Sequence, residues 1–266
     1  MEDRFVASAS FQTDHAVPGE STRELYIDLM ERCILGLIYE DPAQDPWSPH
    51  VFDITKRTRG LDWPLRAHSM IGKLRMDNLR AAVEHVIKRN VPGDLIETGV
   101  WRGGACIFMR SILKAYAITD RIVWVADSFQ GLPAPSPDKY PADADDRHHT
   151  FSQLAVSLNE VQENFAKYGL LDGQVKFLAG WFKDTLPAAP IERLAILRLD
   201  GDIYESTMDG LVCLYGKVSP GGVIIVDDYG AIPACRKAIH DFREMNRIQD
   251  PIQPIDGLGV YWVKSF

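Results

Sequence analysis

Cysteine is scarce in this sequence, and its spacing is wrong for a metal knuckle or a disulfide framework. Among the 266 residues only four are cysteine, and they are far apart with no C-x-x-C pair: Cys33, Cys106, Cys213 and Cys235. This pattern argues against a zinc knuckle and against a small disulfide-stapled fold. Each cysteine lies among apolar residues, so we expect buried free thiols and a reducing, cytoplasmic setting.

Long apolar runs and an excess of positive charge are also missing. No run approaches the ~20 apolar residues that a membrane-spanning helix needs. The N-terminus lacks the basic start and apolar core of a signal peptide. Lysine plus arginine number 29 against 37 aspartate plus glutamate, which gives a net charge of −8. This acidic balance argues against nucleic acid and anionic membrane surfaces as partners.

What is present is the composition of a globular protein, with 46% apolar and 25% charged residues. Beyond Pro92-Gly93, short apolar runs alternate with helical patterns. Strands are predicted at 94–98, 122–126, 175–178, 194–199 and 223–226, and helices near 104–117, 152–168, 206–218 and 233–246. This alternation predicts βαβ units and an α/β fold, with a mostly parallel, doubly wound sheet covered on both faces. Residues 252–255 and 260–263 flank Asp256-Gly257, which predicts an antiparallel C-terminal hairpin with a tight turn.

The chain before this sheet has a different pattern. Residues 1–20 are polar and without periodicity, and we interpret them as a flexible arm. A capping box at Ser21 and Glu24 predicts a helix that runs from there to about residue 40. A second helical pattern follows a connector rich in proline and tryptophan. Residues 21–92 are therefore predicted to form a helical extension, and residues 93–266 the main α/β domain.

The segment 131–150 is rich in proline and aspartate, which predicts a loop. Its charged side chains are expected to face solvent: Asp143, Asp145, Asp146, His148 and His149. Because adjacent residues point to different sides, we do not expect the two histidines to share a metal. The alternative is that they help to close this loop over a substrate.

Ligands of doubly wound sheets bind beyond the carboxyl ends of the strands. The first strand is followed by an acidic-x-Gly-x-x-x-Gly pattern, made by Glu97, Gly99 and Gly103. It lacks the second glycine of the dinucleotide fingerprint, Gly-x-Gly-x-x-Gly. After the second strand comes Asp127, a carboxylate that could accept both hydroxyls of a ribose, followed by Ser128. The pattern favours a nucleoside over a dinucleotide, and an ordinary strand-to-helix turn is the alternative for the glycines.

The third strand ends at Gly180-Trp181. An indole at this edge of the sheet could stack on a purine. A tryptophan that only fills the core is an equally good interpretation.

Carboxylates follow the fourth and fifth strands. Asp200 and Asp202 end one strand, and Asp227 and Asp228 end the next. Like charges this close are costly unless a cation or a proton is shared among them. Oxygen ligands of this type suit Mg²⁺, so we predict Asp200, Asp227 and Asp228 as its ligands. Asp202 is the first candidate for a general base and Asp200 the second, although Asp202 could instead cap the following helix.

Several blocks together identify a family. The sequences ETGVWRGG, VADSFQGLP, GWFKDTLP, LRLDGDIYESTMD, SPGGVIIVDDYG and IPACRKAIHDFR resemble the macrocin O-methyltransferase (TylF-type) family. The resemblance runs from about Ser21 to the C-terminus. It implies a class I methyltransferase fold with a seven-stranded, Rossmann-like sheet, S-adenosylmethionine as cofactor, and Mg²⁺-dependent methylation of a deoxysugar hydroxyl on a secondary metabolite such as an antibiotic. It also implies a homodimer.

The resemblance also assigns residues. It implies that 131–150 is a mobile lid and that Met70, within 69–72, belongs to a segment closing over the cofactor. The cofactor positions that it implies are Met70, Glu97, Gly99, Gly103, Asp127, Ser128, Gly180 and Trp181. The metal positions are Asp200, Asp227 and Asp228, with Asp202 as the proposed base.

Three other functions are considered. A catechol-type methyltransferase would use the same carboxylates on a phenolic hydroxyl. A NAD-dependent oxidoreductase is disfavoured by the missing glycine fingerprint. A non-catalytic nucleoside-binding protein would have no use for the acidic cluster.

Overall fold

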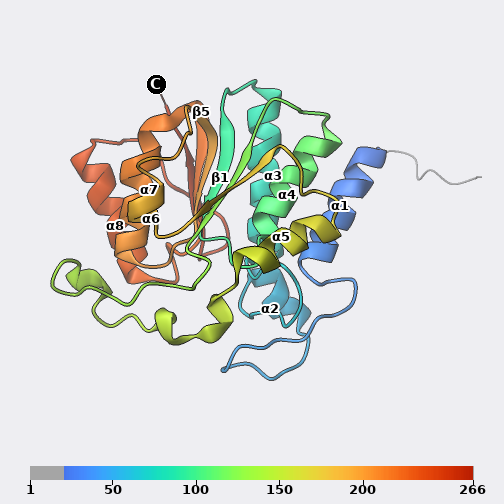
Figure 1. Cartoon of the computed structure of the whole chain (residues 1–266), viewed down its shortest axis with the longest axis horizontal. Helices are drawn as coiled ribbons and strands as arrows, with labels where there is room; N and C mark the ends of the chain where they lie inside the picture. Colours follow the sequence, from blue (N-terminus) through green and yellow to red (C-terminus); the bar gives the residue numbers. More distant parts are fainter. Residues whose placement is uncertain (1–20, 266) are drawn as a thin grey trace, which may run out of the picture.

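The computed structural model describes residues 21–265, so the predicted arm at 1–20 lies outside the described residues. A seven-stranded sheet forms the centre of the molecule, and helices cover both of its faces (Figure 1). Its strands lie in the order β3-β2-β1-β4-β5-β7-β6. Their bounds are β1 Asp94–Thr98, β2 Val123–Asp127, β3 Val175–Ala179, β4 Leu194–Leu199, β5 Val218–Val226, β6 Gln253–Pro254 and β7 Val260–Val263. The predicted α/β architecture is confirmed.

The five strands β1 to β5 are parallel, and β7 pairs antiparallel with both β5 and β6. The central strand β4 is buried along its whole length, as continuous apolar runs in covered parallel sheets are. The predicted antiparallel C-terminal hairpin is confirmed by the pairing of β6 with β7, and the Ile255 N–H closes its loop by donating to the Gly259 carbonyl at 3.0 Å. The Asp256 carboxylate organises that loop by accepting hydrogen bonds from the backbone N–H groups of Leu258 and Gly259.

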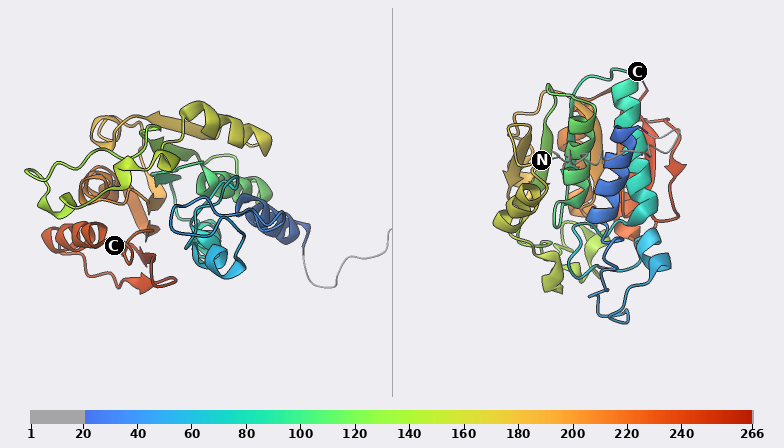
Figure 2. Two further views of the ribbon diagram at one scale, coloured as in Figure 1. Left: turned by 90° about the horizontal axis from the view of Figure 1, so that it is seen from below. Right: turned by 90° about the vertical axis from the view of Figure 1, so that its right-hand side faces the viewer.

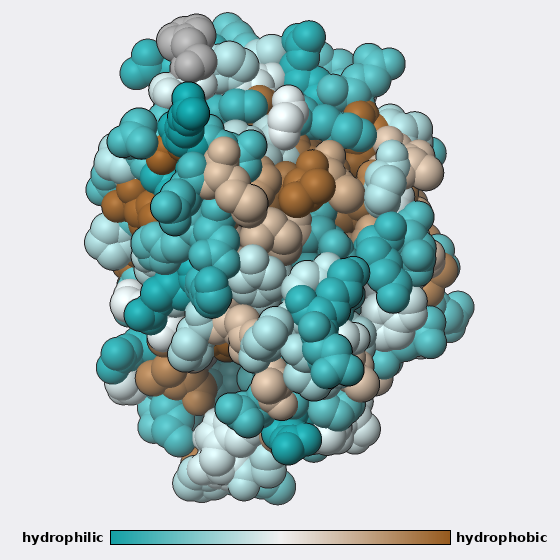
Figure 3. All heavy atoms as spheres, turned by 90° about the vertical axis from the view of Figure 1, so that its left-hand side faces the viewer, coloured by the Kyte–Doolittle hydropathy of each residue, from teal (hydrophilic) through white to brown (hydrophobic). Residues whose placement is uncertain are grey.

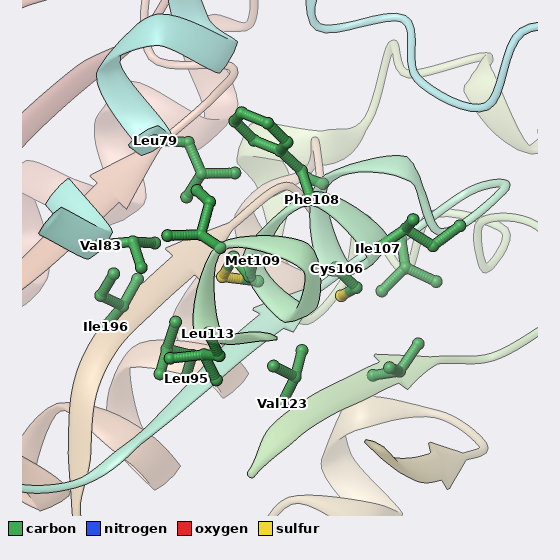
Figure 4. Close-up of a cluster of buried hydrophobic side chains, with 14 of the residues drawn as sticks. Leu79, Val83, Leu95, Cys106, Ile107, Phe108, Met109, Leu113, Val123 and Ile196 are labelled. Atoms are coloured by element: carbon green, nitrogen blue, oxygen red, sulfur yellow. The ribbon is translucent and has the colours of Figure 1, made fainter. Parts of the chain in front are cut away.

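Two helical layers enclose the sheet. On one face lie α3, α4 and α5, with α1 packed on the outside of α3 and α4, and on the other face lie α6, α7 and α8 (Figure 1). Alternate strand residues point to opposite layers, so Leu95 packs with the first layer and Ile96 with the second. Figure 4 shows Leu79 and Val83 of α3 meeting the sheet beside Met109 of α4. The helix bounds are α1 Thr22–Ile34, α2 Ile54–Arg59, α3 Gly72–Lys88, α4 Gly104–Ala115, α5 Leu158–Lys167, α6 Phe182–Thr185, α7 Tyr204–Leu214 and α8 Pro233–Met245.

Some helix ends differ from the sequence prediction, and local chemistry explains them. The first helix ends at Ile34 rather than near residue 40, because Gly36 adopts φ +68° and turns the chain. α5 begins at Leu158 rather than at residue 152, because the Ser157 hydroxyl caps it by accepting from the Glu160 N–H. Helix α2 was not predicted. Of the four free cysteines, two are buried as predicted, whereas Cys33 and Cys213 are only half-buried.

Two segments project over the carboxyl edge of the sheet. One, residues 35–71, is called the cap here, and the other is the lid, residues 131–150; both lie along the lower edge of Figure 1 and are seen from below in the left view of Figure 2. The cap is held by Arg57, whose guanidinium is fully buried and donates to Asp62 and to two backbone carbonyls. The two segments therefore form the border of the site below.

The surface in Figure 3 is mostly hydrophilic, with apolar residues in small separate patches. Within residues 21–265, no helix is both long and apolar enough to cross a membrane.

Candidate active site

A cavity of about 560 Å³ lies at the C-terminal ends of the parallel strands, between the cap and the lid. This is the edge at which doubly wound sheets bind their ligands. Most of the predicted site residues line it: Met70, Gly99, Asp127, Ser128, Trp181, Asp200, Asp202, Asp227 and Asp228. Glu97, Gly103 and Gly180 are not among the lining residues. The fold thus brings together, in one cavity, predicted residues from the ends of five strands and from the cap.

The turn after β1 needs its glycine for a steric reason. Gly99 has φ +86°, and a Cβ at this position would lie 1.8 Å from the carbonyl oxygen of Asp200. The turn after β1 therefore packs directly on the backbone that carries the acidic residues after β4. Gly103 also has positive φ and precedes α4, where a Cβ would press on Val161. Gly103 thus serves the packing of α4, while Gly99 faces the cavity.

Asp127 connects two of the loops that line the cavity. Its carboxylate accepts hydrogen bonds from the backbone N–H groups of Val100 at 2.8 Å and Phe129 at 2.7 Å. Burial raises the pKa of this carboxyl, and these backbone hydrogen bonds oppose the rise. The two bonds orient the carboxylate, and its remaining lone pairs are available for ligand hydroxyls.

The other predicted cofactor residues approach the cavity from two directions. Trp181 occupies the N-cap position of the short helix α6 after β3, and it lines the cavity. Gly180, with φ +137°, lets the chain turn just before it. Met70 reaches the same cavity from the end of the cap.

The predicted acidic cluster is present. Ligand atoms of Asp200, Asp227 and Asp228 all lie within 4.8 Å of one another. Asp202 joins this cluster, because its backbone N–H donates to Oδ2 of Asp228 at 3.1 Å. The alternative that Asp202 caps the following helix is wrong, since α7 has Ile203 at its N-cap position.

Two buried arginines, which the sequence prediction did not include, neutralise part of this cluster. Arg198 of β4 is 1% exposed and donates to Glu97, Asp200 and Asp227. Arg75 of α3 donates to the other oxygen of Asp227. The inference that only a shared cation or proton could relieve the repulsion was therefore incomplete. Arg198 is the one charged residue within the otherwise apolar run 194–199, and this could have indicated its role in the sequence. No feature of the sequence indicated that Arg75 would reach the acidic cluster.

Glu97 lies behind the cavity as a partner of Arg198. Its other carboxylate oxygen accepts from the Cys106 thiol at 3.0 Å, and the side chain is 2% exposed. Burial raises the Glu97 pKa to about 7, against the opposing effect of Arg198. The residue therefore contacts the acidic cluster through Arg198.

The remaining negative charge is concentrated on one side of the cluster. Within residues 21–265, neither Asp202 nor Asp228 forms an ion pair. Burial and then the charge of Asp200 raise the Asp202 pKa to about 7. Burial and three neighbouring carboxylates raise the pKa of Asp228 well above its usual range. Oxygen donors with this excess of negative charge fit a hard divalent cation, with Asp200, Asp227 and Asp228 as the residues that would hold it.

The lid differs from its predicted solvent exposure. Asp143 is fully buried, and its carboxylate accepts from the backbone N–H groups of Tyr204 and Glu205 at the start of α7. A lid residue therefore caps a helix of the main domain. The side chain of Asp146 is also buried and accepts from Nδ1 of His148 at 2.6 Å. His148 lines the cavity.

The fold and the position of the cavity define a class I methyltransferase. The family model described as Macrocin-O-methyltransferase (TylF) matches residues 23–264, and the chain belongs to this family of O-methyltransferases. The NovP O-methyltransferase structure has a TM-score of 0.88 and 53% identity, and the match covers 92% of this chain and all of that one. The calicheamicin methyltransferase CalS11, at a TM-score of 0.59 and 17% identity over 97% and 99% of the two chains, shares the fold.

Three curated relatives are similar over almost their whole lengths. A tetracenomycin-C rhamnosyl 4'-O-methyltransferase of Streptomyces olivaceus is 54% identical over 91% of this chain and 94% of its own. The mycinamicin III 3''-O-methyltransferase of Micromonospora griseorubida is 52% identical, over 91% and 97%. The demethyldecarbamoylnovobiocin O-methyltransferase of Streptomyces niveus is 53% identical, over 92% and 95%.

Proposed function

We propose that this O-methyltransferase transfers a methyl group from S-adenosylmethionine to a sugar hydroxyl of a glycosylated natural product, with the assistance of Mg²⁺. The observation that carries the proposal is the cluster of Asp200, Asp202, Asp227 and Asp228 in the same cavity as Asp127 and Trp181. The cavity thus offers separate places for a nucleoside and for a hydroxyl that must lose its proton.

The acceptor class follows from the relatives. Two of their names specify a sugar position or a glycoside. The acceptors in the three names are forms of the antibiotics tetracenomycin, mycinamicin and novobiocin. Identity above 50% along nearly the whole chain supports the same acceptor class here, although the three named acceptors differ from one another. We therefore propose a glycosylated antibiotic as the acceptor and do not assign the sugar position that is methylated.

The cofactor would lie along the ends of β1, β2 and β3. Asp127 would accept the ribose hydroxyls, with Ser128 beside it, and the Trp181 ring would contact the purine. Gly99 leaves room for the methionine end, and Met70 would cover it. S-adenosylmethionine held there would supply the methyl group of its positively charged sulfur to the acceptor oxygen, and S-adenosylhomocysteine would be the leaving group.

The acidic residues would prepare that nucleophile. Asp200, Asp227 and Asp228 would hold a divalent cation, which when bound would make a nearby hydroxyl easier to deprotonate. Asp202 would accept the proton, because it lines the cavity and its backbone N–H donates to Asp228, which places it beside the proposed metal ligands. Asp200 is the second candidate, but its carboxylate is already engaged by a hydrogen bond from Arg198.

We further propose a cytoplasmic homodimer. Leu25 and Leu29 lie one turn apart on α1 and are each 52% exposed, so this helix has an apolar stripe that a second subunit could cover. Size-exclusion chromatography with light scattering tests the dimer directly. Elution as a monomer at micromolar concentration would contradict it.

The acceptor proposal is tested with a panel of substrates. Methyl transfer would be measured with tetracenomycin, mycinamicin and novobiocin-type glycosides and with a simple catechol. We expect product with at least one glycoside and none with catechol. The reverse result would favour the catechol-type alternative, and calorimetry that showed binding of NAD but not of S-adenosylmethionine would overturn the methyl-transfer chemistry.

A further inference from the structure

Arg75 brings a positive charge from the N-terminal extension into the acidic site. It is the fourth residue of α3, which begins at Gly72, and is 6% exposed. Its guanidinium pairs with Asp227 at the end of β5 and with Asp256 in the C-terminal loop at 3.1 Å. It also donates to the carbonyl of Gly60 in the cap at 3.2 Å. One side chain therefore joins three segments that are far apart in the sequence.

The surrounding backbone leaves space for this guanidinium. A Cβ on Gly60 would lie 2.2 Å from Nη2 of Arg75, and a Cβ on Gly259 would lie 3.0 Å from its Cδ. Gly60 has φ +59° and ends α2, so its conformation and its close approach both require glycine. Glycines in both the cap and the C-terminal loop thus leave the space through which the Arg75 side chain reaches the acidic cluster.

The two arginines divide the acidic cluster into two unlike halves. Asp227 has one oxygen on Arg198 and the other on Arg75. Asp228 has no basic partner among the described residues, and its Oδ2 accepts only a backbone N–H, from Asp202. A cation that enters the cluster therefore meets the largest uncompensated negative charge at Asp228, away from α3.

We propose that Arg75 is a positioning residue that sets the affinity of this site for a divalent cation and directs the cation toward Asp228. This inference rests on the metal part of the proposed function. Arg75 would lower the affinity by its own charge, because it is a fixed cation that already occupies one oxygen of Asp227. It would also keep the Asp227 carboxylate oriented by contacts from outside the sheet.

The charge argument predicts opposite effects for two partners. Arg75→Met removes the competing charge and should tighten binding of Mn²⁺ by on the order of tenfold. Asp256→Asn removes a negative charge that competes with Asp227 for the Arg75 guanidinium. Arg75 should then pair more strongly with Asp227, so Mn²⁺ binding should weaken. In the double variant Arg75 is absent and the change at Asp256 can no longer act through it, so the Mn²⁺ affinity should stay close to that of Arg75→Met.

The measurement is a Mn²⁺ titration followed by electron paramagnetic resonance, on the whole 266-residue chain without cofactor. Arg80→Met is the matched control, because Arg80 lies on the same helix and pairs with Glu84 at the surface. The control should bind Mn²⁺ as the wild type does. Arg75→Lys, which keeps the charge, should also stay close to the wild type.

The outcomes separate the two proposals. Wild type that binds no Mn²⁺ overturns the metal site itself, and with it this inference. Wild type that binds Mn²⁺, together with an Arg75→Met variant that binds equally or more weakly, overturns the role of Arg75 alone. Should Arg75→Met fail to fold, the Asp256→Asn and Arg75→Lys variants test the role of Arg75 instead. Unchanged Mn²⁺ affinity in Asp256→Asn would contradict that role. Strongly changed Mn²⁺ affinity in Arg75→Lys would contradict it as well.

Discussion

The backbone N–H of Asp202 donates to Oδ2 of Asp228, with 3.1 Å between nitrogen and oxygen. Asp202 adopts φ +60°, a left-handed conformation that is uncommon for a residue with a side chain. Strained backbone of this type persists where the surrounding structure holds it, and it is concentrated at functional sites. The contact connects the proposed base to a proposed metal ligand across two neighbouring strand ends.

We predict that Asp202→Asn lowers kcat by ~10²–10⁴-fold, because the amide cannot accept the hydroxyl proton. Binding of S-adenosylhomocysteine should be unchanged, since Asp202 follows β4, whereas the proposed cofactor residues follow β1, β2 and β3. Steady-state kinetics and calorimetry measure the two effects separately. Turnover equal to that of the wild type would exclude Asp202 as the base and favour Asp200.

Gly99→Ala should destabilise the protein by about 3 kcal/mol or more and weaken cofactor binding, because the new Cβ would overlap the Asp200 carbonyl. Gly173→Ala is the matched control, since a Cβ there meets nothing within 4 Å. Chemical denaturation gives both free energies of unfolding. Equal stability of the two variants would show that the turn after β1 tolerates a side chain.

The cap should depend on one buried ion pair. Arg57→Met leaves Asp62 buried without its partner, which we expect to cost ~3–5 kcal/mol of stability. Arg59→Met, on the exposed side of the same helix α2, serves as the control. Denaturation that finds similar small losses in both variants would contradict the importance of the pair.

His68 should make the protein sensitive to acid. Burial, followed by the charges of Lys167 and Arg102, lowers its pKa to about 4, and a ring nitrogen lies 2.7 Å from the Tyr168 hydroxyl. Because the folded state takes up this proton at lower pH than the unfolded state, the contribution is complete above pH 6.5 and is lost as the pH falls toward 4. The loss is about 3 kcal/mol.

The comparison with His68→Gln isolates this group from the buried carboxylates. The stability difference between wild type and variant should shrink by about 3 kcal/mol from pH 7 to pH 4. A difference that stays constant with pH would show that His68 titrates normally.

The sheet was predictable from the sequence for a simple reason. Strands buried on both faces are continuous apolar runs, and their alternation with helices specifies parallel pairing. The same logic places Asp200 and Asp227 at one edge, since both follow such runs. Helix ends were less predictable, because single residues such as Gly36 and Ser157 set them.

Contacts between distant segments could not be predicted. Asp143 is one of several aspartates in a polar loop, and only the folded lid places it at the start of α7. Arg75 reaches Asp227 across 152 positions of sequence, and on α3 it resembles any other helical arginine. The sequence therefore indicated where negative charge gathers, while the structure identified the cations that balance it.

The most direct test of the central claim is the metal dependence of methyl transfer to a glycoside. The enzyme, treated with EDTA, would receive labelled S-adenosylmethionine and the acceptor glycoside from the panel that is methylated best, with and without added Mg²⁺. We predict no labelled product after EDTA, restored transfer with Mg²⁺, and no restoration in an Asp228→Asn variant. Full transfer in the presence of EDTA would contradict the account.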